Sequence, residues 1–170
     1  AASYKFAFSR KEAGQLAKKL GFPVVIKVNT PNILHKTEMK AVAVDLRTVA
    51  ARAVETCRPL IEEKNQELTV SLPEESIWVQ GDAMRLLQVV ENLLTNAVKY
   101  TEQEGRIWLT VERDGEQALV RVRDTGIGIA PDMLPRVFDL FAQAEHPLVR
   151  SQQGLGLGLH LVAGLIEKHG

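Results

Sequence analysis

Residues 85–101, RLLQVVENLLTNAVKYT, are the stretch of sequence that decides the fold. Asp82 precedes them as an N-cap residue, so we predict a helix over about 83–100. At about 100° per residue, the apolar side chains gather on one side of this helix; they are Leu86, Val90, Leu93, Leu94 and Ala97. The opposite side carries Gln88, Asn92, Asn96 and Lys99. The helix therefore has one face for a hydrophobic core and one polar face.

The polar face permits two interpretations. Most such faces are simply solvated, but two asparagines one turn apart are unusual because Asn is a weak helix former. The side-chain oxygen of Asn suits Mg²⁺, a hard cation that keeps several waters and also binds substrate phosphates. Lys99, one turn further on, could meet a phosphate. This face alone leaves both a solvated surface and a Mg–phosphate site open.

Two glycine motifs follow the helix in the sequence. In DTGIGIAP, residues 124–131, Asp124 ends a predicted strand, and Gly126 and Gly128 allow a ligand to approach the backbone. A buried carboxylate at Asp124 could accept a hydrogen bond from the amine of adenine, although an ordinary Asp-Gly turn would read the same. In GLGLGL, residues 154–159, closely spaced glycines lead into a final helix that ends near Lys168, and its first N–H groups could face an anion. The spacing argues against a Rossmann fingerprint, and the Lys-Ser/Thr of a P-loop is missing.

The remaining sequence alternates between helices and strands. Further helices are predicted over 10–20, about 47–64 and near 133–141, and strands over 23–29, 40–46, 67–72, 77–79, 106–113 and 117–123. Asp114-Gly115 joins the last two strands as a hairpin signal. This order predicts an α+β fold, a two-layer sandwich of helices on a mixed, mainly antiparallel sheet.

Composition narrows the functional classes. The 170 residues are 45% hydrophobic, enough for one domain with a core, and no apolar run approaches the roughly 18 residues that cross a membrane. The single Cys57 excludes an internal disulfide, favours a reducing, cytoplasmic compartment, and is expected in the core. Residues 1–40 carry a net charge of +6 and residues 41–170 a net charge of −6. Such asymmetry indicates either a nucleic-acid-binding arm or two segments of different origin, and the motifs favour different origins, with no nucleic acid or membrane as partner.

Together the motifs resemble those of the GHKL (Bergerat-fold) ATPases, and within that superfamily the ATP-binding domain of sensor histidine kinases, over about residues 43–170. The stretch 85–101 resembles the N-box, DTGIGI (124–129) the G1 box, FDLF (138–141) the F-box and GLGLGL (154–159) the G2 box. The resemblance implies ATP or ADP and Mg²⁺ as ligands.

The resemblance also implies a role for each matching residue. Asn96 would coordinate Mg²⁺, Asn92 and Lys99 would lie near the phosphates, and Tyr100 would line the pocket. Asp124 would take the adenine amine, Gly126 and Gly128 would shape the pocket wall, and Gly154, Gly156 and Gly158 would border the triphosphate. Phe138 and Phe141 would anchor a lid, which is compatible with simple core packing.

One position separates kinases from hydrolases in this superfamily. Hydrolytic members carry a Glu four residues before the Mg-binding Asn, as general base for water, whereas this chain has Asn92 there. Glu91 is adjacent but points about 100° away around the helix. The pattern therefore implies a kinase-type site without efficient ATP hydrolysis, and no catalytic residue is assigned.

The first 40 residues resemble a different family, the ATP-grasp domain of ADP-forming acyl-CoA synthetases, through PVVIKV (23–28) and NILHKTE (32–38). In that family the residues matching Lys27 and His35 contact nucleotide and take part in phosphoryl relay, but most of that site is absent, so neither is expected to act here. The kinase resemblance stops at His169-Gly170, where kinase domains continue into two more strands. We therefore interpret the chain as a recombined or engineered fusion, 1–42 with 43–170, in which strands 23–29 and 40–46 replace the missing pair within one folded unit.

Three functional hypotheses follow. None of His35, His146, His160 and His169 lies in a phospho-acceptor pattern such as S-H-E-L-R, and His160 and His169 are expected to be structural or exposed. The leading hypothesis is a Mg-ATP/ADP-binding module of kinase descent without its own phospho-acceptor. The alternatives are a catalytic domain that phosphorylates a separate dimerisation domain in trans, and a structural or design chimera with a vestigial pocket. A second copy, joined through strand exchange, is a further possible partner.

Overall fold

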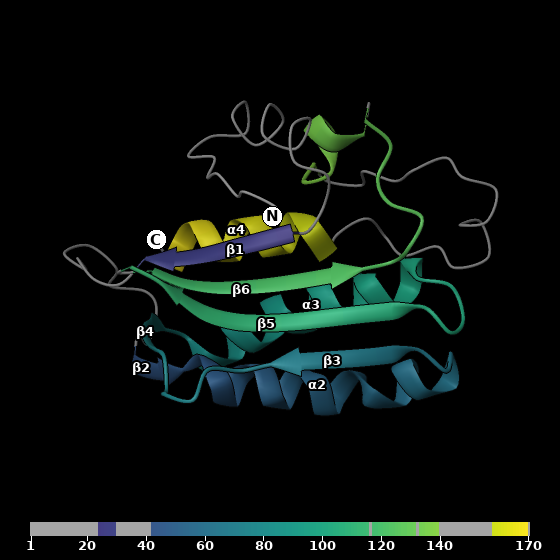
Figure 1. The fold of residues 1–170 in the computed structure, drawn as a ribbon. Coiled ribbons are helices and arrows are strands. Elements are labelled where there is room, and N and C mark those ends of the chain that lie inside the picture. Colours follow the sequence, from purple (N-terminus) through teal and green to yellow (C-terminus); the bar gives the residue numbers. More distant parts are fainter. Residues whose placement is uncertain (1–23, 30–41, 116, 132, 140–157, 170) are drawn as a thin grey trace.

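The computed structural model describes residues 24–29, 42–115, 117–131, 133–139 and 158–169. Three helices lie on one side of a four-stranded sheet (Figure 1): α2 (Leu46–Glu63), α3 (Ala83–Tyr100) and α4 (Gly158–His169). The short 3₁₀ helix η1 (Leu134–Arg136) follows the last strand. The predicted helix over 10–20 lies outside the described residues. The predicted α+β sandwich is confirmed.

The main sheet is mixed, with the strand order β1-β6-β5-β3. The hairpin of β5 (Arg106–Asp114) and β6 (Gln117–Asp124) is antiparallel, and Gly115 in its turn has a φ of +63°, a conformation that glycine adopts readily. β3 (Glu67–Ser71) runs parallel to β5, and β1 (Val24–Asn29) runs antiparallel to β6. Two of the three pairings are thus antiparallel, as predicted.

The two predicted N-terminal strands pair with different partners. The predicted strand 23–29 is confirmed as β1, which extends the sheet beside β6 although the two are far apart in the sequence. The predicted role of strand 40–46 in that sheet is wrong, because β2 (Val42–Asp45) pairs with β4 (Trp78–Gly81) in a separate two-stranded sheet. The reason is local: β2 runs directly into α2 and must stay beside its first turn. Val44 also pairs with Val79, and both are buried.

Helix α3 is the centre of the core. Asp82 caps it as predicted, since its Oδ1 accepts hydrogen bonds from the backbone N–H groups of Met84 (2.9 Å) and Arg85 (3.1 Å). The predicted apolar stripe is buried in one cluster with residues of α2, β5, β6 and α4. Burying one such Leu or Val contributes about 1.5–3 kcal/mol, whereas each Asn costs a helix at most about 0.7 kcal/mol. The stripe therefore easily offsets the poor propensity of the polar face.

Among the described residues, no helix combines the length and apolar character needed to cross a membrane.

Cys57 is a core residue, as expected. It lies in α2, is 1% exposed, and its Sγ is 3.8 Å from Thr95 Oγ1 on α3. Burial raises the pKa of the Cys57 thiol; the Thr95 contact lowers it, and the nearby Glu91 carboxylate raises it. Because folding raises this pKa, the folded state gains stability while the thiol is protonated and loses it as pH rises through the folded-state pKa.

We expect the folded protein to resist thiol reagents. At neutral pH, a disulfide-exchange reagent such as Ellman's should label Cys57 at least about 100-fold more slowly than the urea-unfolded chain, because labelling requires both exposure and thiolate. Protection should fall as the pH is raised. Cys57→Ala is the blank, and labelling of the folded protein at the unfolded rate would show that Cys57 is not buried.

Candidate functional site

The polar face of α3 lies against the beginning of α4. A Cβ atom added to Gly158, the first residue of α4, would lie 3.1 Å from Asn92 Oδ1 and 3.5 Å from Asn96 Nδ2. Gly158 therefore lies beside both amides, and a side chain there would press on Asn92 and touch Asn96 at ordinary contact distance. The structure thus brings together three of the predicted site residues: Asn92, Asn96 and Gly158.

This junction has the chemistry of an anion site. Asn92 Nδ2 donates to the backbone oxygen of Gln88 (2.8 Å), while its Oδ1 lies on the side where a Cβ of Gly158 would project. The first N–H groups of a helix have no intrahelical partners and carry partial positive charge, which favours an anion there. Gln88, Asn92, Asn96 and Lys99 are all half-buried rather than solvated. The described residues contain no cluster of three or more His, Cys, Asp or Glu that could hold a metal. A metal at this junction would therefore depend on amide oxygens and on the anion itself.

The turn after β6 is fastened to the other end of α3. A Cβ on Gly126 would lie 2.3 Å from the backbone oxygen of Tyr100 and 2.8 Å from Asp124 Oδ1, so only glycine fits. The N–H of Ile127 donates to the same Tyr100 oxygen (3.2 Å), and the N–H of Gly126 donates to Asp124 Oδ1 (2.8 Å). Gly128 has a φ of +70°. These contacts bring the turn that begins at Asp124 against the end of α3 at Tyr100.

The expected burial of Asp124 is wrong. Its side chain is exposed at the end of β6, and its neighbour Arg123 is also exposed. Tyr100 and Ile127 are 36% and 44% exposed, so this end of the site is an open surface with apolar area beside a carboxylate. Ile127 was not among the predicted site residues; its position between two glycines was the available signal.

Lys99 lies toward the same end. Its Nζ is 4.9 Å from the centre of the Tyr100 ring, within the range of a cation–π contact. Its expected place beside a phosphate stays a prediction.

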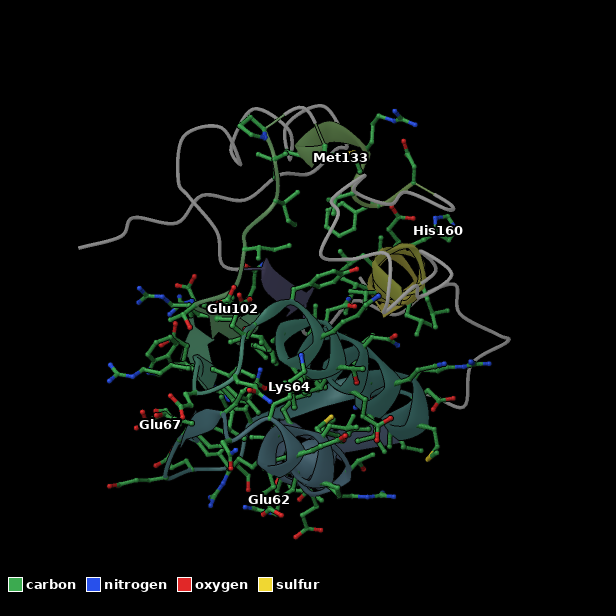
Figure 2. All side chains as sticks on the ribbon, turned by 90° about the vertical axis from the view of Figure 1, so that its right-hand side faces the viewer. Glu62, Lys64, Glu67, Glu102, Met133 and His160 are labelled. Carbon is green, nitrogen blue, oxygen red and sulfur yellow. The ribbon has the colours of Figure 1, made fainter. Side chains whose placement is uncertain are left out.

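Two residues outside every motif fix the end of α3. The last carbonyls of a helix lack intrahelical partners. Lys64 Nζ donates to the oxygens of Val98 (2.8 Å) and Lys99 (3.1 Å), and Gln66 Nε2 donates to those of Val98 (3.1 Å) and Thr101 (2.8 Å). Figure 2 shows Lys64 between α2 and α3. A cation at a helix C-terminus is also favourable. Lys64 and Gln66 thereby hold the turn that carries Lys99 and Tyr100, and no local pattern pointed to them.

Glu91 and its neighbour Asn92 have different surroundings. Its carboxylate acts on the buried Cys57 thiol of α2, whereas the neighbouring Asn92 contacts Gly158 of α4. The helical geometry predicted this divergence, and it leaves no carboxylate of α3 at the junction with α4.

The remaining predicted residues are only partly described. Gly154, Gly156, Phe141, His35 and His146 lie outside the described residues, and for Lys27 only the backbone is described. The short helical stretch predicted near 133–141 is the 3₁₀ helix η1, within i→i+3 bonds that link Ala130, Met133, Arg136 and Asp139. Pro135 lies in that turn and has no N–H for a longer helical ladder. Phe138 is half-buried, and its carbonyl oxygen is 2.9 Å from His160 Nδ1. His160 is thus structural, as expected.

Sequence comparisons match two family models and several kinases. Residues 81–170 match the histidine kinase-, DNA gyrase B- and HSP90-like ATPase family, and residues 1–89 match an ATP-grasp domain family. The chain is similar to the circadian input-output histidine kinase CikA of Synechococcus elongatus, with 44% identity over 91 residues that cover 54% of this chain and 12% of that protein. It is also similar to the uncharacterized sensor-like histidine kinase R01002 of Rhizobium meliloti, with 31% identity over 95% of this chain and 32% of that protein. The chain spans well under half of either relative.

Solved structures give the same picture. The mycobacterial sensor histidine kinase MprB is 30% identical with a TM-score of 0.65, over 76% of this chain and 80% of that one. Full-length ShkA in complex with AMPPNP is 31% identical with a TM-score of 0.65, over 79% of this chain and 27% of that one.

The close packing at Gly126 predicts a sharp substitution effect. Gly126→Ala should lower the free energy of unfolding by about 1–3 kcal/mol, because the new methyl group meets the rigid backbone of Tyr100 rather than a flexible side chain. The measurement is urea unfolding followed by circular dichroism. Gly164→Ala in α4, where an added Cβ meets nothing within 4 Å, is the matched control and should be neutral or stabilising. Equal stability of Gly126→Ala and wild type would contradict the packing.

Proposed function

Because the chain belongs to the histidine kinase-, DNA gyrase B- and HSP90-like ATPase family and has the fold of sensor histidine kinase ATP-binding domains, we propose that it binds Mg-ATP or Mg-ADP along the polar face of α3. The phosphates would lie at the start of α4, and the base at the turn after β6. The observation that carries the proposal is the contact of Gly158 with Asn92 and Asn96. It joins the amides of one motif to the helix N-terminus of another.

Each end of the site has a distinct task. At the phosphate end, Asn96 would supply an oxygen to Mg²⁺ and the first N–H groups of α4 would face phosphate oxygens. Gly154 and Gly156 would border the same triphosphate. When bound, Mg²⁺ would neutralise part of the phosphate charge. At the base end, the free oxygen of Asp124 would accept from the adenine amine, beside the exposed faces of Tyr100 and Ile127.

The site supports binding and phosphotransfer better than hydrolysis. Position 92 is an amide and not a carboxylate, and the Glu91 carboxylate acts on the α2 side, so α3 offers no general base for water at the phosphate end.

A second candidate function is phosphorylation of a histidine on a separate dimerisation domain. It is favoured by the family. It is also favoured because His160 of this chain is already engaged with the Phe138 carbonyl, so the phospho-acceptor would be a histidine elsewhere. Incubation with labelled ATP and a kinase dimerisation domain would test it.

Titration with ATP and ADP, with and without Mg²⁺, tests the nucleotide site. Asp124→Ala should raise the Kd for ATP at least about tenfold, as expected for loss of a hydrogen bond to a charged group. Asn96→Ala should remove the effect of Mg²⁺ on affinity while leaving Mg-free binding near the wild-type value. Asp124→Asn keeps an acceptor oxygen and should fall between, and Glu167→Ala, on the exposed side of α4, should change nothing. Wild-type protein indifferent to both nucleotides would favour the vestigial pocket instead.

We further propose that the segment before Val42 has a different origin from the rest and stabilises it through β1. The proposal is supported by the ATP-grasp match over 1–89, the charge change near residue 41 and the β1–β6 pairing. Residues 42–89 build β2, α2, β3, β4 and the start of α3, so the junction would lie before Val42. The similarity to R01002 covers 95% of the chain and therefore most of this segment, which favours a common origin instead.

Deleting residues 1–40 should abolish cooperative unfolding, because it removes the edge strand β1, exposes the ladder groups of β6 and opens one side of the core around Ala118, Val120 and Val122. The measurements are thermal and urea unfolding of the shortened protein, with sedimentation to detect strand exchange between copies. A shortened protein that unfolds cooperatively as a monomer would refute the stabilising role.

A further inference from the structure

The first turn of α4 makes a contact that the proposed nucleotide site does not use. His160 is half-buried, and its Nδ1 lies 2.9 Å from the carbonyl oxygen of Phe138. A carbonyl can only accept a hydrogen bond, so Nδ1 must carry the proton and donate. Figure 2 shows His160 on α4 below the segment that contains Met133. The bond therefore ties α4 to a segment more than 20 residues away in the sequence.

That segment is internally braced. Backbone bonds join Ala130 to Met133 (2.9 Å), Met133 to Arg136 (2.9 Å) and Arg136 to Asp139 (2.8 Å). Arg136 and Asp139 also approach to 4.0 Å as an exposed ion pair, which adds little by itself. Leu134 in its middle is buried. Anchoring Phe138 should therefore also restrict the motion of the other described residues between 130 and 139.

The two ends of the nucleotide site meet through this unit. Residues 130–139 follow directly on the Asp124–Gly128 turn, which Tyr100 holds at the end of α3. On α4, Gly158 contacts Asn92 and Asn96, and His160 is only two residues further along the same helical turn. The His160–Phe138 bond thus connects α4, which contacts the phosphate end through Gly158, to the segment that follows the base end.

We propose that His160 is a positioning residue that holds residues 130–139 against the start of α4 and so fixes the two ends of the nucleotide site relative to each other. It touches no nucleotide; it acts through Phe138 and the turn behind it. The proposal rests on the proposed nucleotide site. Its consequence is kinetic: without the bond, the two ends separate more often, and bound nucleotide leaves sooner.

The test compares His160→Ala with His160→Asn in the full chain. The Asn amide nitrogen can take the place of Nδ1 and still donate, whereas Ala cannot. Glu167→Ala is the control for a change elsewhere on α4. Stopped-flow release of a fluorescent ADP analogue should be about fivefold faster for His160→Ala, as expected for loss of one neutral hydrogen bond, and within about twofold of wild type for His160→Asn. Glu167→Ala should release at the wild-type rate.

A second readout needs no nucleotide. Hydrogen exchange of the Arg136 and Asp139 amides should speed up in His160→Ala and recover in His160→Asn, and ¹⁵N NMR of the wild-type imidazole should show Nδ1 protonated. Faster exchange with unchanged nucleotide release would overturn the positioning role and leave a purely structural bond. Unchanged exchange would overturn the anchoring itself. Wild type that binds no nucleotide would instead refute the proposed function, and exchange would then show only whether the anchor exists.

Discussion

Helix α3 must be apolar on one side and polar on the other, and the rest of the molecule is arranged around that constraint. Its apolar stripe is buried in one cluster with residues of α2, β5, β6 and α4, so α3 packs against each of these elements. The polar stripe cannot face the same neighbours without losing its hydrogen-bonding partners. It is instead half-covered by the glycine that opens α4, whose backbone fits beside Asn92 and Asn96 because it has no side chain. The candidate site therefore forms where α4 packs against the polar edge of α3.

The two ends of α3 differ in how they are held, and this difference shapes the site. At its start, Asp82 satisfies two N–H groups locally, within its own turn. At its end, the unpaired carbonyls are satisfied by Lys64 and Gln66, which come from the end of α2 and the approach to β3. The Tyr100 oxygen receives the Ile127 N–H, so the same turn also anchors the chain beyond β6. The position of Asp124 therefore depends on contacts made far from any ligand.

The Asn92 side chain determines whether the polar face offers a general base. An amide at position 92 can accept and donate but cannot remove a proton from water near neutral pH. The neighbouring carboxylate of Glu91 belongs to the α2 side, where it acts on Cys57. A helix that places an acid and an amide about 100° apart gives them different surroundings. With the amide beside α4, the described part of α3 offers no carboxylate to act as a general base there.

The sequence by itself determined those features whose causes are local. The helix over 83–100 and its cap follow from periodicity and one Asp, and the β5–β6 hairpin follows from Asp-Gly. Tertiary structure decided what depends on distant partners. β2 pairs with β4 because it is tied to the first turn of α2, and the exposure of Asp124 depends on which elements pack around the end of β6. Lys64, Gln66 and His160 act through backbone carbonyls of other elements, and a backbone carbonyl leaves no mark in a sequence pattern.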